Sequence, residues 1–335
     1  MKLSIITVNR NNVAGLRTTL ESTFGSQPGF IDWEQIVVDG ASSDGSFAEV
    51  DRYRGDPRLG WCVSEPDSGI YNAMNKGAAH ARGDYLLFLN SGDMLMPDVL
   101  ARIFAESWEA DIAFGDVLVQ KPGRTELRKL DDSEGRDATY FLFCSLPHQS
   151  TLFSRNLHEK IGGYDETLRI YADRKFCLRA VLEYNPVIWR FPFVVSTFMW
   201  GGISSDPALD ADRRRECEEM LVPFFGRYAA HRVCKHAPKP KPLLDEKMDK
   251  SIRDDAAFRS FLQVVARSAR YFYLEKPSVP VLEGKQSPTE SDDRRLAIEF
   301  LDAAAALRGH PRIAIFVRHV LHWLAKRLRG RKSGR

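Results

Sequence analysis

The sequence predicts an α/β protein with a mostly parallel sheet covered by helices on both faces, followed by a helical C-terminal extension. From Lys2 to about Asn90, short apolar runs alternate with helical patterns, which is typical of buried parallel strands. Each of these runs ends in polar residues. Beyond about Pro207 the segments become long, charged and helical. We therefore expect a first domain at residues 1–206 and a helical region at residues 207–335.

The individual elements follow from periodicity. The predicted strands are LSIITV, EQIVVD, LGWCVSE and DYLLFLN, then a strand near residues 111–114, a hairpin at 117–130 and the run HQSTLF. Helices are expected before Thr23, from about Pro97, and at residues 70–81, and a turn at Gly162-Gly163. In the helix at 70–81, Ala73, Met74 and Gly77 lie on one apolar stripe, Tyr71 lies on another face, and Asp67 or Ser68 is the expected N-cap.

Composition excludes several classes of protein. The 335 residues include 44% hydrophobic and 28% charged residues and carry a net charge of +3, too little to imply a nucleic-acid partner. The five cysteines form no CxxC pair, so we expect neither a zinc site nor a disulfide framework. The apolar start has no cleavage site and is interpreted as a strand, and no run reaches the roughly 18 apolar residues of a membrane helix. We expect a cytoplasmic protein.

Polar side chains follow the predicted parallel strands, whose carboxyl ends meet at one edge of the sheet. The first strand ends at Thr7 and Asn9, the second at Asp39, and the fourth leads through Ser91 to Asp93. Asp39 can accept hydrogen bonds from a base or a ribose. Asp93, presented by a glycine turn, offers the hard oxygen ligand that Mg²⁺ or Mn²⁺ prefers on a diphosphate.

Several of these residues also have structural interpretations. A turn before a following helix explains Asp93 almost as well, and Asp44 is more simply a helix cap. Lys76 and Arg82 either supply positive charge to a phosphate or lie solvated on a surface helix. His148 is either a ligand, on the acceptor side, or a structural hydrogen-bonding group. These alternatives stay open at the level of residue patterns.

Six motifs together resemble glycosyltransferase family 2. In chain order they are SIITVNRNN, QIVVDGASSDGS, EPDSGIYNAMNKGAAHARGDYLLFLNSGD, HQSTLFSR, GGYDETLRIYADRKFCLR and WGGISS, over about residues 2–205. The long central string resembles a branch of bacterial enzymes that assemble exopolysaccharide or lipid-linked glycans. The resemblance implies a GT-A fold and an inverting transfer of sugar from a nucleoside-diphosphate sugar to a hydroxyl of a glycan or lipid-linked acceptor.

The resemblance also implies roles for individual residues. By position, Thr7, Asn9 and Asp39 match the nucleoside contacts, and Asp93 matches the residue on the metal and the donor diphosphate. Asp173, which by itself looks like a helix cap, matches the acceptor-side carboxylate that acts as general base.

One position departs from the family pattern. The metal motif has two aspartates around one residue, and Ser91 stands at the first of them. We group Ser91 with the donor-binding residues. Its presence predicts that water and phosphate oxygens complete the metal shell or that metal dependence is reduced.

Other functions were weighed against this one. A sugar nucleotidyltransferase needs a glycine-rich phosphate loop after the first strand, where this chain has Asn9-Arg10-Asn11-Asn12. A dinucleotide oxidoreductase needs GxGxxG at the same place. A catalytically silent nucleotide-sugar-binding or scaffold protein remains an alternative, because Ser91 removes a metal carboxylate.

The C-terminal segment has the pattern of a basic amphipathic helix. Its apolar side carries Ile313, Phe316, Val317, Val320, Leu321, Leu324 and Leu328, and its other side carries Arg318, His322, Lys326 and Arg329. Such a helix either lies on an anionic membrane surface or packs its apolar side on the catalytic domain. The first interpretation makes the protein peripheral on the inner face of the membrane.

Overall fold

The computed structural model describes residues 1–29, 31–130, 145–203 and 206–221. The chain divides into two compact units, and the first consists of Met1–Gly135 and Cys144–Glu216. The fold and the site lie in this first unit. The boundary predicted after residue 206 stays a prediction, and the basic helix predicted near the C-terminus is outside the described residues. In the part of the chain that is described, no helix is both long and apolar enough to cross a membrane.

The first unit is built on one nine-stranded sheet. Its strands are β1 (Leu3–Asn9), β2 (Trp33–Asp39), β3 (Leu59–Ser64), β4 (Tyr85–Phe88), β5 (Met94–Leu95), β6 (Ile112–Lys121), β7 (Arg124–Arg128), β8 (Thr151–Ser154) and β9 (Ile188–Met199). The order is β3-β2-β1-β4-β8-β6-β9-β5, with β7 paired to β6. Pairing is parallel from β3 to β4 and between β6 and β9, and β8 is antiparallel to both of its neighbours. The predicted fold class is confirmed.

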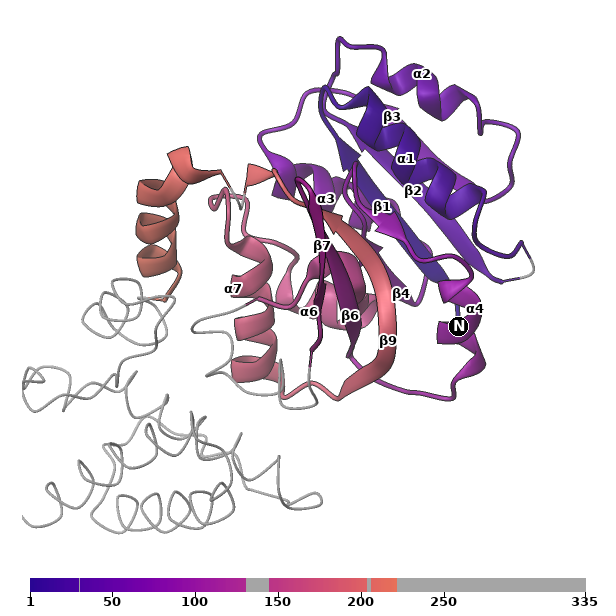
Figure 1. Cartoon of the computed structure of the whole chain (residues 1–335). Coiled ribbons are helices and arrows are strands. Elements are labelled where there is room, and N and C mark those ends of the chain that lie inside the picture. Colours follow the sequence, from indigo (N-terminus) through magenta and orange to yellow (C-terminus); the bar gives the residue numbers. More distant parts are fainter. Residues whose placement is uncertain (30, 131–144, 204–205, 222–335) are drawn as a thin grey trace, which may run out of the picture. The chain divides into compact units, whose positions relative to one another are not determined.

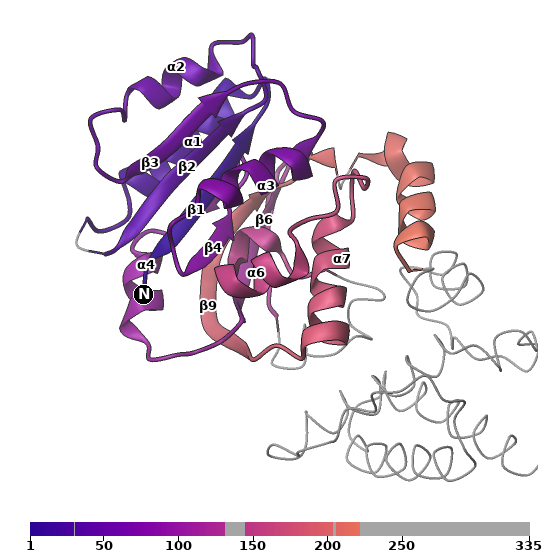
Figure 2. The same ribbon diagram turned by 180° about the vertical axis from the view of Figure 1, so that it is seen from behind.

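Helices cover both faces of this sheet. They are α1 (Val13–Phe24), α2 (Ser46–Asp51), α3 (Ile70–His80), α4 (Val99–Ala105), α6 (Arg155–Ile161) and α7 (Ala172–Arg179). In Figure 1 helix α1 lies in front of the first strands, whereas in Figure 2, seen from behind, α3 and α6 lie in front.

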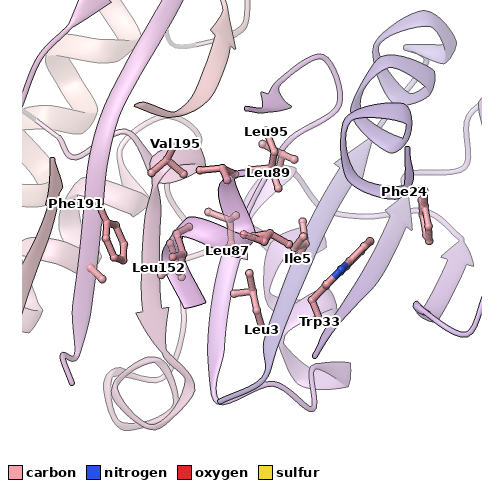
Figure 3. Packing of buried hydrophobic residues seen from close by; sticks show 14 of the residues in the cluster. Leu3, Ile5, Phe24, Trp33, Leu87, Leu89, Leu95, Leu152, Phe191 and Val195 are labelled. Carbon is pink, nitrogen blue, oxygen red and sulfur yellow. The ribbon is translucent and has the colours of Figure 1, made fainter. Parts of the chain in front are cut away.

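Side-chain alternation along β1 explains the two layers. Leu3 and Ile5 pack in one buried cluster with Phe24 of α1 (Figure 3). Ile6 points to the opposite face, as alternate residues of a strand do. There it meets Gly77 of α3, where a Cβ atom would clash with the Ile6 side chain. Glycine therefore lets α3 approach the sheet closely.

The strand registers bring three chain segments to the same edge. Asn9 is paired with Asp39 at the ends of β1 and β2. Beyond β4, the Ser91 N–H donates to the carbonyl of Val8 at 3.1 Å. The ends of β1, β2 and β4, which lie in the middle of the sheet, thus reach one level. This is where ligands bind in open α/β sheets.

Two local predictions were wrong. The run HQSTLF is not all strand, because the Ser150 N–H bonds to the Pro147 carbonyl at 2.9 Å and folds residues 148–150 into a 3₁₀ turn before β8. Gly69, not Asp67 or Ser68, is the N-cap of α3, and Asp67 accepts the Gly69 N–H at 3.0 Å. Tyr71 is buried.

Asp44 has the capping function that its sequence context indicates, although Gly45 occupies the cap position. One carboxylate oxygen accepts the Ser46 N–H at 3.0 Å at the start of α2, and the other accepts the Val13 N–H at 2.9 Å at the start of α1. A single side chain therefore satisfies free N–H groups of two helices.

His158 of α6 is buried in an aromatic cluster. Its ring lies 5.3 Å from Phe176, 5.5 Å from Tyr164 and 5.6 Å from Phe88, measured between ring centroids. Within the described chain its Nε2 atom has no hydrogen-bond partner. Burial lowers the pKa of His158 to about 4, so the folded protein holds this ring neutral at physiological pH.

This burial predicts a pH-dependent stability. The folded pKa of His158 is about 4, and the unfolded chain has a histidine pKa of about 6.5. The unfolded state therefore binds the proton first, and stability is lost as the pH falls from about 6.5 toward 4. Between pH 7 and pH 5 this group should cost the wild type about 2 kcal/mol of unfolding free energy.

The measurement is urea unfolding of the wild type and of His158→Leu at both pH values. The variant should lose about 2 kcal/mol less than the wild type over this interval, whatever its absolute stability. All other titrating groups are shared, so their contributions cancel in the comparison. Equal losses in the two proteins would show that His158 is not held neutral by burial.

Candidate active site

A cleft of about 1080 Å³ opens at the carboxyl edge of the central strands. Asn9 after β1 and Asn90 to Asp93 after β4 line it, together with the start of α3. It is also lined by the turn at His148, by residues 166–171 and 173 before and within α7, and by residues 198–203 at and after the end of β9. Segments far apart in the sequence therefore share one concave surface.

Asp39 is fully buried beneath this cleft and does not line it. Its Oδ1 atom accepts from Asn9 Nδ2 at 2.8 Å and Ser42 Oγ at 2.6 Å, and Oδ2 accepts from the Ser42 N–H at 2.9 Å and Ser64 Oγ at 2.6 Å. Burial raises the pKa of Asp39, but the bonds from Ser42, Ser64 and Asn9 outweigh it and hold that pKa below its usual value.

These bonds occupy the roughly four lone-pair positions of the carboxylate. A direct bond from Asp39 to a ligand would displace one of them. The position of Asn9, in contrast, depends on Asp39.

Ser91 connects the first and fourth strands. Its hydroxyl donates to Asn9 Oδ1 at 2.7 Å and accepts from Asn12 Nδ2 at 3.1 Å. Ser91, which stands where the family pattern has an aspartate, thus directs its hydroxyl to hydrogen bonds with other residues of the protein. Asn9 in turn lies between Asp39 and Ser91, with its own side chain on the cleft.

Asp93 is a buried carboxylate that faces the cleft. Gly92, at a φ of 105°, makes the turn before it, a conformation that favours glycine. Asp93 Oδ1 accepts the Met199 N–H at 3.0 Å. Burial raises the pKa of Asp93 to about 6, while His148 and the Met199 N–H act in the opposite direction. Its negative charge is only partly compensated by the chain.

His148 lies close to two acidic residues that line the cleft, Asp93 and Asp173. Its Nε2 atom is 3.0 Å from Asn90 Nδ2, and its Nδ1 atom is 3.8 Å from Asp173 Oδ2. Burial lowers the pKa of His148, but the negative charges of Asp173 and Asp93 outweigh it, so the pKa lies above the usual histidine value. The 3₁₀ turn after Pro147 gives the ring this position.

Asp173 lies in the first turn of α7, whose N-cap is Tyr171, so it is not the cap residue. Its Oδ1 atom accepts the Arg174 N–H at 2.8 Å and is 3.2 Å from the hydroxyl of Tyr71, which also donates to the Ile170 carbonyl at 2.7 Å. Two groups thus hold Oδ1, and Oδ2 is the oxygen that faces His148.

Glu216 fixes the chain that leads into α7. Its carboxylate accepts the backbone N–H groups of Arg169 at 2.8 Å, Ile170 at 2.7 Å and Tyr171 at 3.3 Å. Three consecutive amides end on one buried side chain that lies more than forty positions further along the chain. The approach to Asp173 is therefore held from outside its own helix.

Besides Asp39, three predicted donor-binding residues do not line the cleft. Thr7 is buried, and its hydroxyl accepts from Gln35 at 3.0 Å. The Lys76 ammonium lies 2.8 Å from Glu65 and 2.9 Å from the Pro66 carbonyl. Arg82 pairs with Glu34 at 2.7 Å, near the start of β2, so it lies roughly 15 Å along the strands from the edge that carries Asp39.

Arg10, Asn12, Asp67, Tyr71 and Trp200 line the cleft and were not predicted as site residues. Arg10 and Asn12 directly follow Asn9, so their position after the first strand was a usable signal. Asp67 follows β3 in the same way. Tyr71 gave no such signal, because its burial depends on contact with α7.

The cleft offers a metal ion few protein ligands. In the described residues, no group of three or more histidine, cysteine, aspartate or glutamate side chains is placed to hold one. Asp93 nevertheless fits a cation, because a buried carboxylate whose pKa is raised by burial is stabilised by nearby positive charge. One carboxylate needs further oxygen ligands from water or a phosphate.

An open, mostly parallel α/β sheet with a large cleft at its carboxyl edge is typical of nucleotide-binding folds. Comparison with known proteins identifies the family. Residues 4–173 match the model of glycosyl transferase family 2. The chain belongs to this family and is a glycosyltransferase.

Relatives and solved structures agree with this assignment. An uncharacterized glycosyltransferase of Mycobacterium tuberculosis is 36% identical over 246 residues, 68% of this chain and 88% of the relative. A PGL/p-HBAD biosynthesis glycosyltransferase of Mycobacterium bovis is 33% identical over 211 residues, 60% of this chain and 78% of the relative. The crystal structure of S. aureus TarS 1–349 in complex with UDP-GlcNAc has the same fold, with a TM-score of 0.55 at 15% identity over 98% of this chain and 92% of that one.

Proposed function

We propose that this glycosyltransferase moves a sugar from a nucleoside diphosphate to an acceptor hydroxyl in one inverting step, with Asp173 as general base. The observation that carries the proposal is the grouping of Asp93, His148 and Asp173 in a single cleft. One carboxylate lies at the ends of the parallel strands, where a diphosphate binds in such folds. The other lies in the first turn of α7, and we assign it to the acceptor.

The donor side of the cleft is assigned to the ends of β1 and β4. The UDP-GlcNAc complex of TarS supports a nucleoside-diphosphate sugar as the donor class. Asn9 is the direct contact, and Asp39, Thr7 and Ser91 act by holding it and its strand in place. Lys76 and Arg82 have no part in donor binding in this proposal, because their charges are paired away from the cleft.

Asp93 would hold a divalent cation, Mg²⁺ or Mn²⁺, together with the diphosphate. Such an ion supplies positive charge to the departing diphosphate. The chain itself contributes the buried carboxylate and the Met199 N–H that orients it. Arg10, which lines the cleft next to Asn9, adds a positive charge on the donor side.

Asp173 would act on the acceptor. Its Oδ1 atom is held by Tyr71 and the Arg174 N–H, which leaves Oδ2 to accept the proton of the acceptor hydroxyl. The acceptor oxygen forms a bond to the anomeric carbon from the face opposite the diphosphate. The bond to the diphosphate breaks, and the nucleoside diphosphate leaves with the electron pair. The configuration at that carbon is inverted.

The base assignment is tested with Asp173→Asn. The amide keeps the shape of the side chain but cannot accept the proton, so transfer should fall by roughly two to four powers of ten. Donor affinity, measured by calorimetry, should stay within about twofold, because in this proposal Asp173 acts on the acceptor and not on the donor.

Asp165→Asn is the matched control, since Asp165 lies before the same helix and pairs with Lys175. It should leave transfer nearly unchanged. Full turnover by Asp173→Asn would refute the base assignment. A wild type that binds the donor without any turnover would instead favour a catalytically silent binder.

A donor screen tests the metal and the reaction together. Nucleoside-diphosphate sugars are incubated with the protein and acceptors, with Mn²⁺ or with EDTA, and release of the diphosphate is measured. We expect release that requires the cation, and Asp93→Asn should need about tenfold more Mn²⁺ for half-maximal rate, because the site loses its charged ligand. Equal rates in Mn²⁺ and EDTA would contradict a metal role for Asp93.

A role in cell-surface glycan assembly, such as exopolysaccharide, is a further part of the proposal. The name of the M. bovis relative, which links it to PGL/p-HBAD biosynthesis, supports a glycan pathway of this kind. The basic pattern at residues 313–329 adds the proposal that the protein binds peripherally to an anionic membrane surface. This would bring the cleft to a lipid-linked acceptor.

Sedimentation with vesicles tests this part. The full chain should bind vesicles of phosphatidylcholine and phosphatidylglycerol, but not of phosphatidylcholine alone. Replacing Arg318, Lys326 and Arg329 by alanine should weaken the binding roughly a hundredfold, since each basic residue contributes about 1 kcal/mol at an anionic surface. Equal binding by the substituted and natural chains would refute the proposal.

A further inference from the structure

The cleft has an exposed apolar rim at the end of β9. This rim consists of Met199, Trp200 and Ile203, whose exposed fractions are 39%, 46% and 38%, and all three line the cleft. Single exposed apolar residues are common on protein surfaces, but several together at a binding cleft indicate a contact surface. The same cleft is polar at Asn9, Asp93 and Asp173.

Trp200 is held in position although its ring is exposed. The backbone N–H of Trp200 donates to the Gln120 carbonyl at 2.9 Å, which ties the backbone at this residue to β6. Its ring lies edge-on to Phe198 at 6.3 Å between centroids, and the Lys121 ammonium is 4.8 Å from its centroid. An aromatic ring fixed by its neighbours forms a flat apolar surface that binds without further ordering.

The rim is directly connected to the catalytic side chains. The residue before Trp200 is Met199, whose N–H binds the Asp93 carboxylate at 3.0 Å. Trp200 therefore directly follows the residue whose N–H binds the carboxylate assigned to the donor diphosphate. A molecule that presents a hydroxyl in this cleft therefore shares the cleft with the apolar rim.

We infer that the acceptor is amphipathic: a hydroxyl-bearing sugar whose aglycone is apolar, an alkyl or aryl group that lies on Met199, Trp200 and Ile203. This inference rests on the proposed function. The polar part of the cleft binds the sugar and its reacting hydroxyl, and the apolar rim buries the adjoining group. In this inference the apolar side chains of the rim contact the acceptor, while the backbone N–H of Met199 stays on the Asp93 carboxylate.

The test compares acceptors that share a sugar and differ in aglycone. Methyl, octyl and p-nitrophenyl glycosides are assayed with the full chain and with Trp200→Ala, Trp200→Phe and Trp189→Ala. Trp189 is the matched control, because it lies on the same strand with 37% of its surface exposed and does not line the cleft. Hydrolysis of the donor by water is measured in parallel.

Trp200→Ala should raise the KM of the octyl and p-nitrophenyl glycosides about tenfold and that of the methyl glycoside less than about twofold. Trp200→Phe should recover most of the loss. Trp189→Ala should change none of these values, and donor hydrolysis should be the same in all four proteins. In the wild type, a KM lower than that of the methyl glycoside for the p-nitrophenyl but not for the octyl glycoside identifies an aryl aglycone. The reverse result identifies an alkyl chain.

An equal rise in KM for the methyl and octyl glycosides in Trp200→Ala would overturn the inference, because the ring would then hold the sugar itself. No loss for any acceptor would also overturn it and would indicate that another surface covers Trp200. Failure of the proposed function appears separately, as a wild type that turns over no donor. Even then, calorimetry of octyl against methyl glycoside with wild type and Trp200→Ala decides whether the rim binds apolar groups.

Discussion

The carboxylate of Asp39 is the constraint on which the cleft depends. It is buried at the carboxyl edge of the sheet and gathers four hydrogen bonds from Asn9, Ser42 and Ser64. Removing any partner leaves a buried polar group unsatisfied, which costs about 1–3 kcal/mol. Through Asn9 the network continues to Ser91 after β4. The ends of separate strands are thus locked to one another before a ligand arrives.

Much of this arrangement follows from local patterns. The apolar runs that became β1, β2 and β3 are buried on both faces or end in turns with strong residue preferences, so their places could be predicted. The place of strand β9 could not be predicted in this way. It contains Pro192 and pairs in parallel with β6 across register shifts near Gly115, where Val195 and the Phe193 carbonyl leave no room for a side chain. Such pairing depends on contacts distant in sequence.

The same distinction applies to the site. Asn9, Asp39 and Asp93 stand at strand ends, where topology alone brings them together. Arg82 and Lys76 carry the right charge, but ion pairs with Glu34 and Glu65 direct them elsewhere. The chemistry of a single residue cannot reveal a partner that only the fold brings close. The reach of Tyr71 to Asp173 was hidden for the same reason, since it crosses from α3 to α7.

The three hydrogen bonds that Glu216 accepts determine where the chain can be truncated or fused. The match to the family ends at residue 173, yet the backbone before Asp173 is fastened by a side chain more than forty residues later. A fragment cut after residue 206 would keep every strand but release three amides beside the proposed base. In exchanges of C-terminal regions between relatives, the junction therefore belongs beyond residue 216, so that the exchanged region leaves these three hydrogen bonds intact.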